Sequence, residues 1–432
     1  GYDGIVITDW GGSNDHIKGV AAGSDLEMPT PGMDSARQIV KAVQEGKLSE
    51  AAVDACVDRM LTAVLTLTAG DSGSSTNPDD FDKEAHHALA RKAASQSAVL
   101  LKNRENILPL KPGTHVALIG DFAFEPRYQG AGSSMVNVTK LDKMIDLIGE
   151  YDLVLSGASR GYLRSGEADE VLMKEAVDLA RSVDVVIYCF GLDELSESEG
   201  IDRTHMRIPQ NQISLLEAIS RVNENVVGIL SAGAAVEMPW HHCLKGMIHG
   251  YLYGQAGAGA MLDIITGKVN PSGRLNETYP VRYEDTPAFK YFPSEQRNSE
   301  YREALYVGYR YYDTAKVKAL YPFGFGLSYT KFEYSGKDGA EFTLTNTGGQ
   351  DGAEVAQLYI GKPDGKVFRP EKELKGFQKV FLKAGESRTV TIPFDDKTFR
   401  YWNVRTKRWE IEGGAYTVMV GASCLDIRLT AE

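Results

Sequence analysis

This sequence contains few cysteines, and its basic residues are outnumbered by acidic ones. Each of these features argues against certain classes of binding site. Only four of the 432 residues are cysteine, with no CxxC pair and no metal-ligand spacing. We expect buried free thiols, and the cellular compartment is left undecided. Lys and Arg number 47 against 59 Asp and Glu, which gives a net charge of −12. Because phosphate binding needs a basic face, neither nucleic acid nor an anionic membrane is expected as a partner.

Long apolar runs are missing as well. No stretch reaches the roughly 18 apolar residues that a membrane-spanning helix needs. Hydrophobic residues make up 43% of the chain and charged residues 25%, as is ordinary for a soluble globular protein. The length exceeds one ordinary core, so we expect about three domains. The sequence opens at Gly1 without an initiator Met and passes straight into a strand, so the true N-terminus is expected elsewhere.

Residues 1–70 are predicted to contain two β/α units. Residues 4–8 (GIVIT) form a short apolar run typical of a strand buried on both faces, and 23–28 fits a second strand. Helical periodicity follows at 35–45 and at 49–67, where Ser49 is the expected N-cap. Two parallel strands cannot form a stable domain alone, because both edges and one face stay open. The segment therefore indicates the end of something larger.

A second region runs from 83 to 330, after a predicted linker at 71–82 that begins rich in Gly, Ser, Asn and Pro. Helix and strand alternate through this region. Helices are expected at 83–101 and near 139–149, 169–182, 210–222 and 255–267, and strands at 115–120, 152–155, 184–191, 226–232 and 247–253. This βαβ rhythm predicts an open, mostly parallel α/β sheet with helices on both faces.

The last region, residues 331–432, changes to an all-β pattern. Short alternating segments are bounded by Gly, Asp or Pro at 341–348, 355–360, 377–382, 389–394, 409–411, 416–420 and 427–429. Such closely spaced short strands predict a small β-sandwich.

Asp9 is the first candidate for chemistry. It stands at the carboxyl end of the apolar strand at 4–8, where reactive groups gather in parallel β/α architectures. Trp10 beside it offers an apolar wall that can pack on the C–H face of a pyranose. On position alone, Asp9 can equally be a cap for the loop that follows the strand.

The second candidate is the acidic loop at 191–203 (GLDELSESEGIDR). Five of its 13 residues are acidic. Such a run is commonly a solvated surface loop, and that interpretation stays open. A carboxylic acid on a loop at the carboxyl edge of a sheet is also well placed to reach a glycosidic oxygen as a general acid.

The two candidates gain meaning as a pair. Glycoside hydrolysis with retention needs a carboxylate nucleophile and an acid/base about 5–5.5 Å apart. Asp9 and an acid of the 191–203 loop lie on different predicted domains, so they would meet in an interdomain cleft. No His/Cys cluster, Walker loop or GxSxG elbow competes. The Gly-rich turn at 129–134 lacks a following GK[ST], so a turn that approaches the cleft fits it better than a phosphate site.

Two segments carry a resemblance to glycoside hydrolase family 3. Residues 1–11 (GYDGIVITDWG) look like the family's nucleophile segment, in which the Asp before Trp-Gly is the nucleophile. Residues 197–203 (ESEGIDR) resemble its acid/base loop, where the Glu before Gly matches Glu199, with Glu197 as the alternative. Further similarity lies at 100–103, 108–110, 128–137, 270–275, 307–312 and 321–329, and at 374–377 and 414–416.

The resemblance implies a fold in three parts. Residues 1–70 would be the C-terminal part of a (β/α)8 barrel, 83–330 an (α/β)6 sandwich with a mostly parallel sheet, and 331–432 a fibronectin-type-III-like β-sandwich. The family's complete barrel carries an early Asp, an Arg and a Lys-His pair that grip the sugar, and no matching segment is found here. The chain therefore looks like a truncated member of the family.

Site residues follow from the same resemblance. It carries over Asp9 and Glu199 as catalytic residues and Trp10 as a substrate contact. Asp25, in the segment that resembles the eighth barrel strand, is expected to be structural. Three further residues are expected to line the cleft and bind substrate, namely Arg127, Gln129 and Ser133.

The implied mechanism is double displacement. Asp9 would attack the anomeric carbon while Glu199 protonates the leaving oxygen, and Glu199 would then activate the water that hydrolyses the glycosyl ester. Asp9 should be ionised among hydrogen-bond donors, and Glu199 should sit in a less polar place that raises its pKa. No metal or organic cofactor is called for.

The implied activity is that of an exo-acting β-glucosidase on an oligosaccharide or an aryl or alkyl β-glycoside. β-Xylosidase or another exo-glycosidase of the family is the alternative. A protein of another class stays open: a non-catalytic carbohydrate-binding or structural protein, because most of the shell that positions a sugar is missing. An exposed half-barrel would also favour association, so a homo-oligomer is possible.

Overall fold

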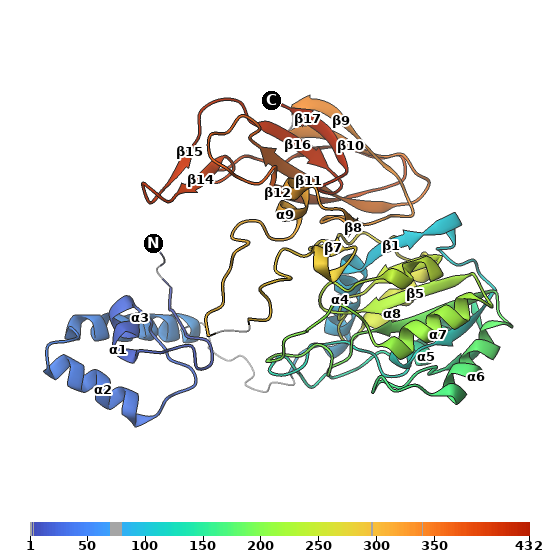
Figure 1. Ribbon diagram of the computed structural model, residues 1–432, viewed down its shortest axis with the longest axis horizontal. Coiled ribbons are helices and arrows are strands. Elements are labelled where there is room, and N and C mark those ends of the chain that lie inside the picture. Colours follow the sequence, from blue (N-terminus) through green and yellow to red (C-terminus); the bar gives the residue numbers. More distant parts are fainter. Residues whose placement is uncertain (1, 3, 70–79, 295–296, 339) are drawn as a thin grey trace. The chain divides into compact units, whose positions relative to one another are not determined.

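The chain folds into two compact units, Gly1–Asp82 and Lys83–Glu432, and each is described by itself (Figure 1). The computed structural model describes residues 2, 4–69, 80–294, 297–338 and 340–432. Most of the predicted linker lies outside these residues, and the predicted domain boundaries stay predictions. Among the described residues, no helix combines the length and the apolar character needed to cross a membrane.

The first unit is mainly helical. Its helices are α1 (His16–Ala22), α2 (Met33–Gln44) and α3 (Glu50–Thr68). Ser49 caps α3 as predicted, because its side chain accepts a hydrogen bond from the Ala52 N–H. The two predicted strands are reduced to one parallel bridge between Ile7 and Leu26. Among the described residues of the unit, neither segment has a further strand beside it, so no longer ladder forms there.

Few apolar side chains are buried in this unit. Among the described residues of this unit, the buried hydrophobic ones are Ala42, Leu48 and Cys56, whereas α3 exposes Val57, Leu61, Val64, Leu65 and Leu67. Asp25 has a fully covered side chain that accepts hydrogen bonds from the Val6 N–H at 2.8 Å and Arg59 Nε at 2.9 Å. The Arg59 hydrogen bond lowers the pKa of Asp25. The carboxylate thus joins the segment before Asp9 to α3, the structural role expected for it.

The second unit contains a six-stranded sheet in the order β1-β6-β5-β4-β2-β3. Five strands run parallel, as predicted: β2 (Thr114–Ile119), β3 (Leu153–Ser159), β4 (Val185–Gly191), β5 (Val226–Ser231) and β6 (Gly246–His249). The helices between them are α5 (Met144–Leu147), α6 (Glu170–Ala180), α7 (Gln210–Ser220) and α8 (Gly257–Ile265), with 3-10 turns η2 (Asp121–Ala123), η3 (Ile148–Glu150) and η4 (Pro239–Cys243).

The predicted helix at 83–101 is too long. Helix α4 ends at Ser97, and β1 (Val99–Asn103) follows as an edge strand that pairs antiparallel with β6. Val99 and Leu101 pack in the core on one face of the sheet and Leu100 in the core on the other. A short run that alternates between two apolar faces satisfies a strand better than the turn of a helix.

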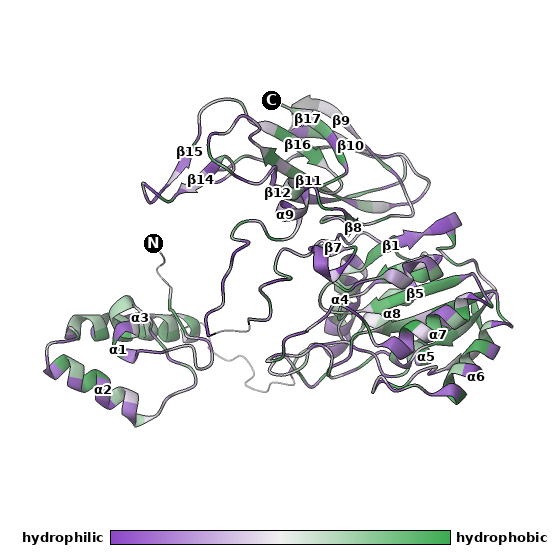
Figure 2. Cartoon of the chain, viewed as in Figure 1, coloured by the Kyte–Doolittle hydropathy of each residue, from purple (hydrophilic) through white to green (hydrophobic). Residues whose placement is uncertain are grey.

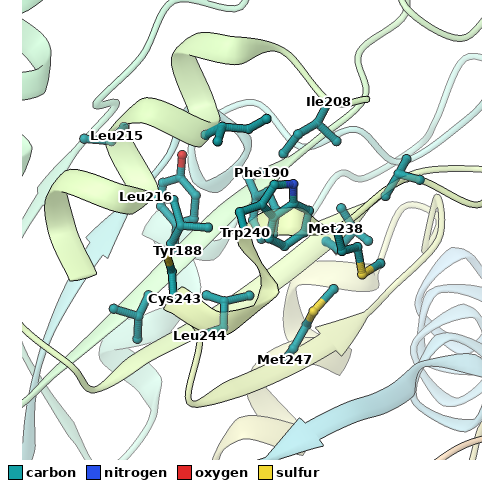
Figure 3. Packing of buried hydrophobic residues seen from close by; sticks show 14 of the residues in the cluster. Tyr188, Phe190, Ile208, Leu215, Leu216, Met238, Trp240, Cys243, Leu244 and Met247 are labelled. Carbon is teal, nitrogen blue, oxygen red and sulfur yellow. The ribbon is translucent and has the colours of Figure 1, made fainter. Parts of the chain in front are cut away.

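Both faces of the sheet are covered, as expected for an α/β sandwich. Residues of α6, α7 and η4 pack on one face and residues of α4, α5 and α8 on the other. The apolar colour follows the central strands in Figure 2. Figure 3 shows the first core, where Trp240 meets Phe190 edge to face with ring centroids 5.0 Å apart. The central strands are thereby fixed, and so are the positions at which their loops leave the sheet.

A β-sandwich ends the chain. One sheet has the order β13-β10-β9 and the other β12-β11-β16-β17, with a separate β14–β15 hairpin. The strands are β9 (Phe332–Asp338), β10 (Glu341–Asn346), β11 (Gly352–Gly361), β12 (Glu373–Leu382), β13 (Ser387–Thr391), β14 (Arg400–Asn403), β15 (Arg408–Ile411), β16 (Thr417–Gly421) and β17 (Ile427–Ala431). Sequence reasoning missed β9 and β14.

The sandwich and the α/β sheet share a buried junction within the second unit. Short elements lead into it, namely β7 (Tyr279–Pro280), η5 (Tyr283–Asp285), α9 (Tyr309–Ala315) and β8 (Ala319–Tyr321). Arg274 pairs with Glu354 of β11 at 2.7 Å, and both side chains are more than nine-tenths buried. Removing one partner would leave a buried charge alone, so this pair fixes how the two parts meet.

Candidate functional site

Three loops leave neighbouring strands at the carboxyl edge of the α/β sheet. The acidic loop follows β4, which lies between β2 and β5 in the sheet. The loop after β2 contains residues 127–134, and the loop after β5 spans 231–237. Because the carboxyl ends of parallel strands open on one side, the acidic loop has one of these loops on each flank.

Glu199 faces the loop after β2. Its Oε2 accepts a hydrogen bond from the Ser133 N–H at 2.6 Å, and its own N–H donates to the Ala131 carbonyl at 3.4 Å. A Cβ on Gly132 would lie 2.7 Å from both Glu199 Cβ and Oε2, so glycine is needed for this close approach. The side chain is otherwise exposed. The predicted acid/base thus sits at the surface of the second unit, held by one backbone turn.

The predicted rise in the pKa of Glu199 is wrong for this arrangement. Hydrogen bonds from the Ser133 side chain and backbone hold the pKa of Glu199 below its ordinary value. Donors that bind the ionised carboxylate favour it over the neutral acid. An acid poised to give a proton would have to lose these contacts or gain a less polar surrounding.

Glu197 turns to the opposite flank. Its Oε2 accepts a hydrogen bond from the Gly233 N–H at 2.8 Å, in the loop after β5. Glu197 is partly buried, whereas Glu199 is exposed. Each carboxylate accepts a hydrogen bond from a different flanking loop, Glu199 from the Ser133 N–H after β2 and Glu197 from the Gly233 N–H after β5. The structure therefore gives the two candidates different surroundings.

Arg127 is buried and connects two of the loops. Its guanidinium is 0% exposed and donates to the carbonyls of Gln129, Leu192 and Glu197 at 2.8, 3.4 and 3.0 Å. Because this buried guanidinium already donates to three backbone carbonyls, it has no exposed face that could contact a sugar. The placement favours a positioning role over the direct substrate contact expected for Arg127.

The other two predicted cleft residues lie in the loop after β2. Gln129 braces that loop, because its Oε1 accepts from the Val136 N–H at 2.9 Å and its Nε2 donates to the Tyr128 hydroxyl at 2.8 Å. Ser133 is exposed and bound to Glu199. The structure therefore brings Arg127, Gln129 and Ser133 together with Glu199, and substrate binding by them stays a prediction.

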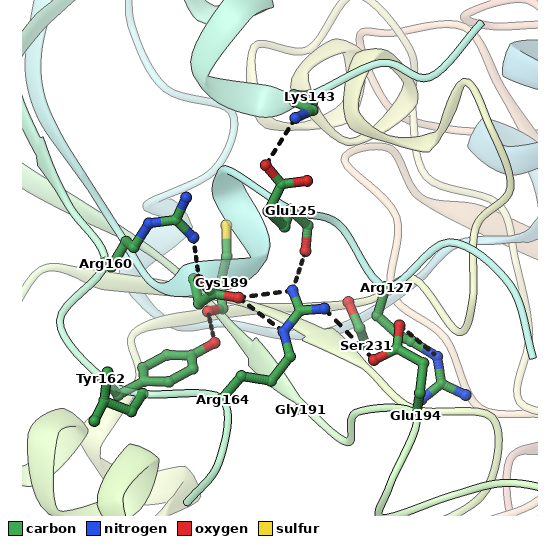
Figure 4. Close-up of polar contacts among 12 residues, drawn as sticks. Glu125, Arg127, Lys143, Arg160, Tyr162, Arg164, Cys189, Gly191, Glu194 and Ser231 are labelled. Atoms are coloured by element: carbon green, nitrogen blue, oxygen red, sulfur yellow. Dashed lines mark hydrogen bonds and ion pairs between the residues drawn. The ribbon is translucent and has the colours of Figure 1, made fainter. Parts of the chain in front are cut away.

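A polar network below these loops was missed by sequence reasoning (Figure 4). Asp121, at the end of β2, accepts hydrogen bonds from Arg160 and from Arg164 Nε, the latter at 2.8 Å. Arg164 Nη1 also lies 3.5 Å from Oε2 of Glu194 in the acidic loop. The other carboxylate oxygen, Glu194 Oε1, lies 3.7 Å from Arg127 Nε. The network joins the loops after β2, β3 and β4. The available signal was the Gly-Asp pair that ends β2, at the same edge as the acidic loop.

A second group missed from the sequence lies on the side of β5. Glu277 is largely buried, and burial together with the nearby Glu197 raises its pKa, while the Ala235 backbone and Arg203 oppose the rise. Arg203 Nη1 donates to the Ala235 carbonyl at 3.4 Å. Glu277 is 42 or more residues from these partners in the sequence, so no local pattern could reveal the group.

Asp9 and Trp10 belong to the first unit. The Asp9 Oδ1 accepts a hydrogen bond from the Trp10 N–H at 2.8 Å. Asp9 is exposed, and the Trp10 side chain is 69% exposed. Both are thus open to a ligand, and the meeting of Asp9 with Glu199 across a cleft stays a prediction because it joins the two units.

Among the described residues, neither the cysteine thiols nor the side chains that can bind a metal form a further candidate site. All four cysteines are buried and unpaired, as expected. In the part of the chain that the structure describes, no three His, Cys, Asp or Glu side chains gather as they would around a metal ion.

Comparison with known proteins shows which family the chain belongs to. The Glycosyl hydrolase family 3 C-terminal domain matches residues 98–329, which is more than half of the chain, and a Fibronectin type III-like domain matches residues 354–424. The chain belongs to glycoside hydrolase family 3. The family resemblance drawn from residues 1–11 and 197–203 is thereby confirmed, as are the α/β sandwich and the fibronectin-type-III-like sandwich.

Relatives in this family align with nearly the whole chain. It is 45% identical over 99% of its length to the thermostable beta-glucosidase B of Acetivibrio thermocellus, and 41% identical over 100% to an exo-alpha-(1->6)-L-arabinopyranosidase of Bifidobacterium breve. A crystal structure of a GH3 beta-glucosidase from Bifidobacterium adolescentis is 41% identical and covers 100% of the chain with a TM-score of 0.93. The chain spans 58%, 59% and 64% of these three proteins.

Proposed function

We propose that this family 3 protein acts as a retaining, exo-acting β-glycosidase, and that its preferred substrates are terminal β-D-glucosides. The observation that carries the proposal is the similarity of the entire chain to enzymes named β-glucosidase, at 45% identity in sequence and a TM-score of 0.93 in structure. The acidic loop is held at a sheet edge between two flanking loops and carries an exposed carboxyl group, Glu199, of the kind that serves as a general acid in this reaction.

Asp9 is proposed as the nucleophile and Glu199 as the acid/base. Asp9 is exposed at the end of its apolar segment, beside the ring of Trp10, which can pack on the C–H face of a sugar. Glu199 gives a proton to the leaving oxygen and later takes one from water. Its contact with the Ser133 N–H stabilises the ionised form, which is the form that the second step requires.

Three residues around Glu199 are proposed to serve the substrate in different ways. Ser133 presents its hydroxyl at the exposed turn beside the carboxylate, and Gln129 holds that turn in shape. Arg127 acts from inside by joining the turn to the acidic loop. We therefore expect Ser133→Ala to change the KM for substrate more than a substitution at a distant surface position does.

Stereochemistry and trapping test the proposed mechanism. Hydrolysis of an aryl β-D-glucoside is followed by ¹H NMR, and the first product should be β-D-glucose, because two displacements restore the configuration. A 2-deoxy-2-fluoro-glucoside, whose glycosyl ester breaks down slowly, should leave the mass of a 2-deoxy-2-fluoroglucosyl group on the peptide containing Asp9. First formation of α-D-glucose would refute retention, and a label on another residue would refute Asp9 as the nucleophile.

The length of chain needed for activity is a separate question. We expect the 432-residue chain alone to be slow, since positioning a sugar against two carboxylates needs more contacts than Trp10 and the three loops supply. A fusion to the part of thermostable beta-glucosidase B that the match does not cover should raise kcat/KM by at least about 100-fold. Equal activity of chain and fusion would contradict this expectation. Sugar binding without turnover in both would favour the non-catalytic alternative.

A second activity is favoured by one group of relatives. Two bifidobacterial proteins named exo-alpha-(1->6)-L-arabinopyranosidase are each 41% identical to the chain. Competition between 4-nitrophenyl β-D-glucoside, β-D-xyloside and α-L-arabinopyranoside gives the ratio of kcat/KM values, which is the measure of specificity. A ratio that favours the arabinopyranoside or the xyloside would replace β-glucosidase as the activity while leaving the family and mechanism intact.

A further inference from the structure

The acidic loop is attached along its length to the loop after β5. The Leu192 N–H donates to the Ser231 carbonyl at 2.9 Å, where the two strands end. Further on, the Glu237 N–H donates to the Met206 carbonyl at 2.7 Å. Between these backbone contacts, Glu197 and Arg203 reach the β5 loop with their side chains. Glu199 lies between Glu197 and Arg203, so its backbone is held from both sides.

The contact between Glu197 and Gly233 is the tightest of these side-chain links. The carboxylate accepts from the Gly233 N–H at 2.8 Å, and a Cβ at position 233 would lie 3.1 Å from both carboxylate oxygens. A side chain at position 233 would therefore crowd the Glu197 carboxylate, which would have to shift by a few tenths of an ångström. The Glu197 carbonyl also accepts from the buried Arg127 at 3.0 Å. Glu197 is therefore fixed at the backbone from one flank and at the carboxylate from the other.

Arg203 makes the second link and balances charge. Its Nη1 donates to the Ala235 carbonyl at 3.4 Å, and the neighbouring Nη2 is buried with no hydrogen-bond partner among the residues that the structure describes. Glu197 and Glu277 both interact electrostatically with this guanidinium. A partly buried arginine between two carboxylates stabilises them against mutual repulsion, and its own charge is compensated in return.

We infer that Glu197, Gly233 and Arg203 form an anchor that fixes the acidic loop to the loop after β5, so that Glu197 is a positioning residue for the catalytic carboxyl of Glu199. The inference rests on the proposed function for its catalytic consequence, and the anchor itself stands on the contacts alone. It assigns Glu197 a role other than that of the alternative acid/base.

Hydrogen exchange tests the anchor without any assay of activity. Exchange of peptides covering 192–206 and 231–237 is measured by mass spectrometry in the wild-type chain and in Glu197→Ala, Glu197→Gln and Gly233→Ala. Glu197→Ala should speed exchange of the Gly233 region at least about tenfold, and Glu197→Gln should restore most of the protection because an acceptor oxygen remains. Gly233→Ala should also speed exchange, by a smaller factor than Glu197→Ala, since its methyl group crowds the carboxylate without removing it. Unchanged exchange in Glu197→Ala would overturn the anchor.

Two controls keep this result specific. Asp202→Asn removes an exposed acid from the same loop and should leave exchange at 231–237 as it is. Thermal unfolding of each variant shows whether the sheet remains folded. If Glu197→Ala fails to fold, Gly233→Ala and Glu197→Gln still decide, because they change one contact each. Faster exchange in Asp202→Asn as well would overturn the claim that Glu197 makes the link.

Leaving-group dependence tests the catalytic consequence in the active form of the enzyme. Loss of a general acid slows a poorly activated alkyl glucoside far more than an aryl glucoside whose leaving group needs no proton. A positioning residue should slow both by a similar factor, about 10- to 100-fold for Glu197→Ala, with Glu197→Gln within about tenfold of wild type. A leaving-group dependence in Glu197→Ala that matches Glu199→Gln would overturn the assignment. If no variant or wild type hydrolyses glycosides, the proposed function fails while the exchange result still decides the anchor.

Discussion

An apolar segment precedes each of the two proposed catalytic carboxylates, and the two segments differ strongly in how far they are buried. In the second unit, all of β4 is buried before the acidic loop begins. In the first unit, the segment at 4–8 leaves Val6 43% and Ile7 49% exposed before Asp9. β4 has a hydrogen-bonded strand on each side and helices on both faces. The segment at 4–8 pairs with residues near Leu26, and no second strand neighbours it in the part of its unit that the structure describes.

This difference in burial indicates how firmly the surroundings of each carboxylate hold it in position. The loop of Glu199 is held by neighbouring strands, by buried Arg127 and by the network around Asp121, so its geometry is set within the second unit. Among the described residues, the Asp9 carboxylate accepts one hydrogen bond, from the N–H of the adjacent Trp10. A nucleophile needs its position fixed to within a fraction of an ångström. We therefore expect the acid side of the site to be preorganised and the nucleophile side to depend on contacts beyond those of its own unit.

Asp9→Asn should produce the largest effect. An amide cannot form the glycosyl ester, so kcat should fall on the order of 10⁴- to 10⁶-fold, as for removal of other covalent nucleophiles. Because Asp9 is exposed, the substitution should leave the fold and glucose binding unchanged. Product release is measured by fluorescence and sugar binding by calorimetry. A fall of less than tenfold would remove Asp9 from the mechanism.

Glu199→Gln should come second, with a loss that depends on the substrate. The neutral amide keeps the length of the side chain but can neither give nor take the proton, which costs about 10²- to 10⁴-fold for an alkyl glucoside. The first step should be almost unaffected for a dinitrophenyl glucoside. Glu194→Gln, an acid of the same loop that faces Arg127 and Arg164, is the matched control. Equal losses in both variants would indicate general disturbance of the loop rather than loss of the acid.

Much of the fold could be predicted from the sequence because its signals are local. The apolar runs of β2, β4 and β5 and the N-cap of α3 were found within a few residues. The start of β1 was missed because the run at 98–101 continues the apolar pattern of α4, and only its pairing with distant β6 makes it a strand. Tertiary contacts override local preference in such cases.

The candidate site was predictable only in part for the same reason. The positions of Asp9 and Glu199 follow from motifs. The opposite directions of Glu197 and Glu199 depend on which strands flank β4, and the burial of Arg127 depends on carbonyls from the acidic loop. The depressed pKa of Glu199 comes from Ser133, 66 positions earlier. Sheet order, which a sequence does not display, decides all three.

A pair of core substitutions sharpens the comparison of the two segments. Ile187 of β4 is 0% exposed and Ile7 is 49% exposed. Ile187→Ala should lower the free energy of unfolding by about 2–5 kcal/mol, because it removes buried methyl groups and leaves a cavity. Ile7→Ala should cost about 1 kcal/mol or less, since part of its side chain already meets water. Urea titration followed by circular dichroism measures both. A cost for Ile7→Ala as large as that for Ile187→Ala would show that other parts of the protein cover the segment at 4–8.

Ser133→Ala should have the smallest effect and a definite sign. The Ser133 side chain and backbone lower the pKa of Glu199 by hydrogen bonding to its ionised form. Alanine keeps the N–H but loses the hydroxyl, so the pKa of Glu199 should rise. The first step needs Glu199 protonated, and its pKa sets the alkaline limb of kcat/KM, so that limb should move to higher pH. The acidic limb, governed by the nucleophile, should stay in place. An alkaline limb that stays fixed or moves to lower pH would show that Ser133 does not control the proton of the catalytic acid, and that the turn after β2 serves Glu199 by position alone.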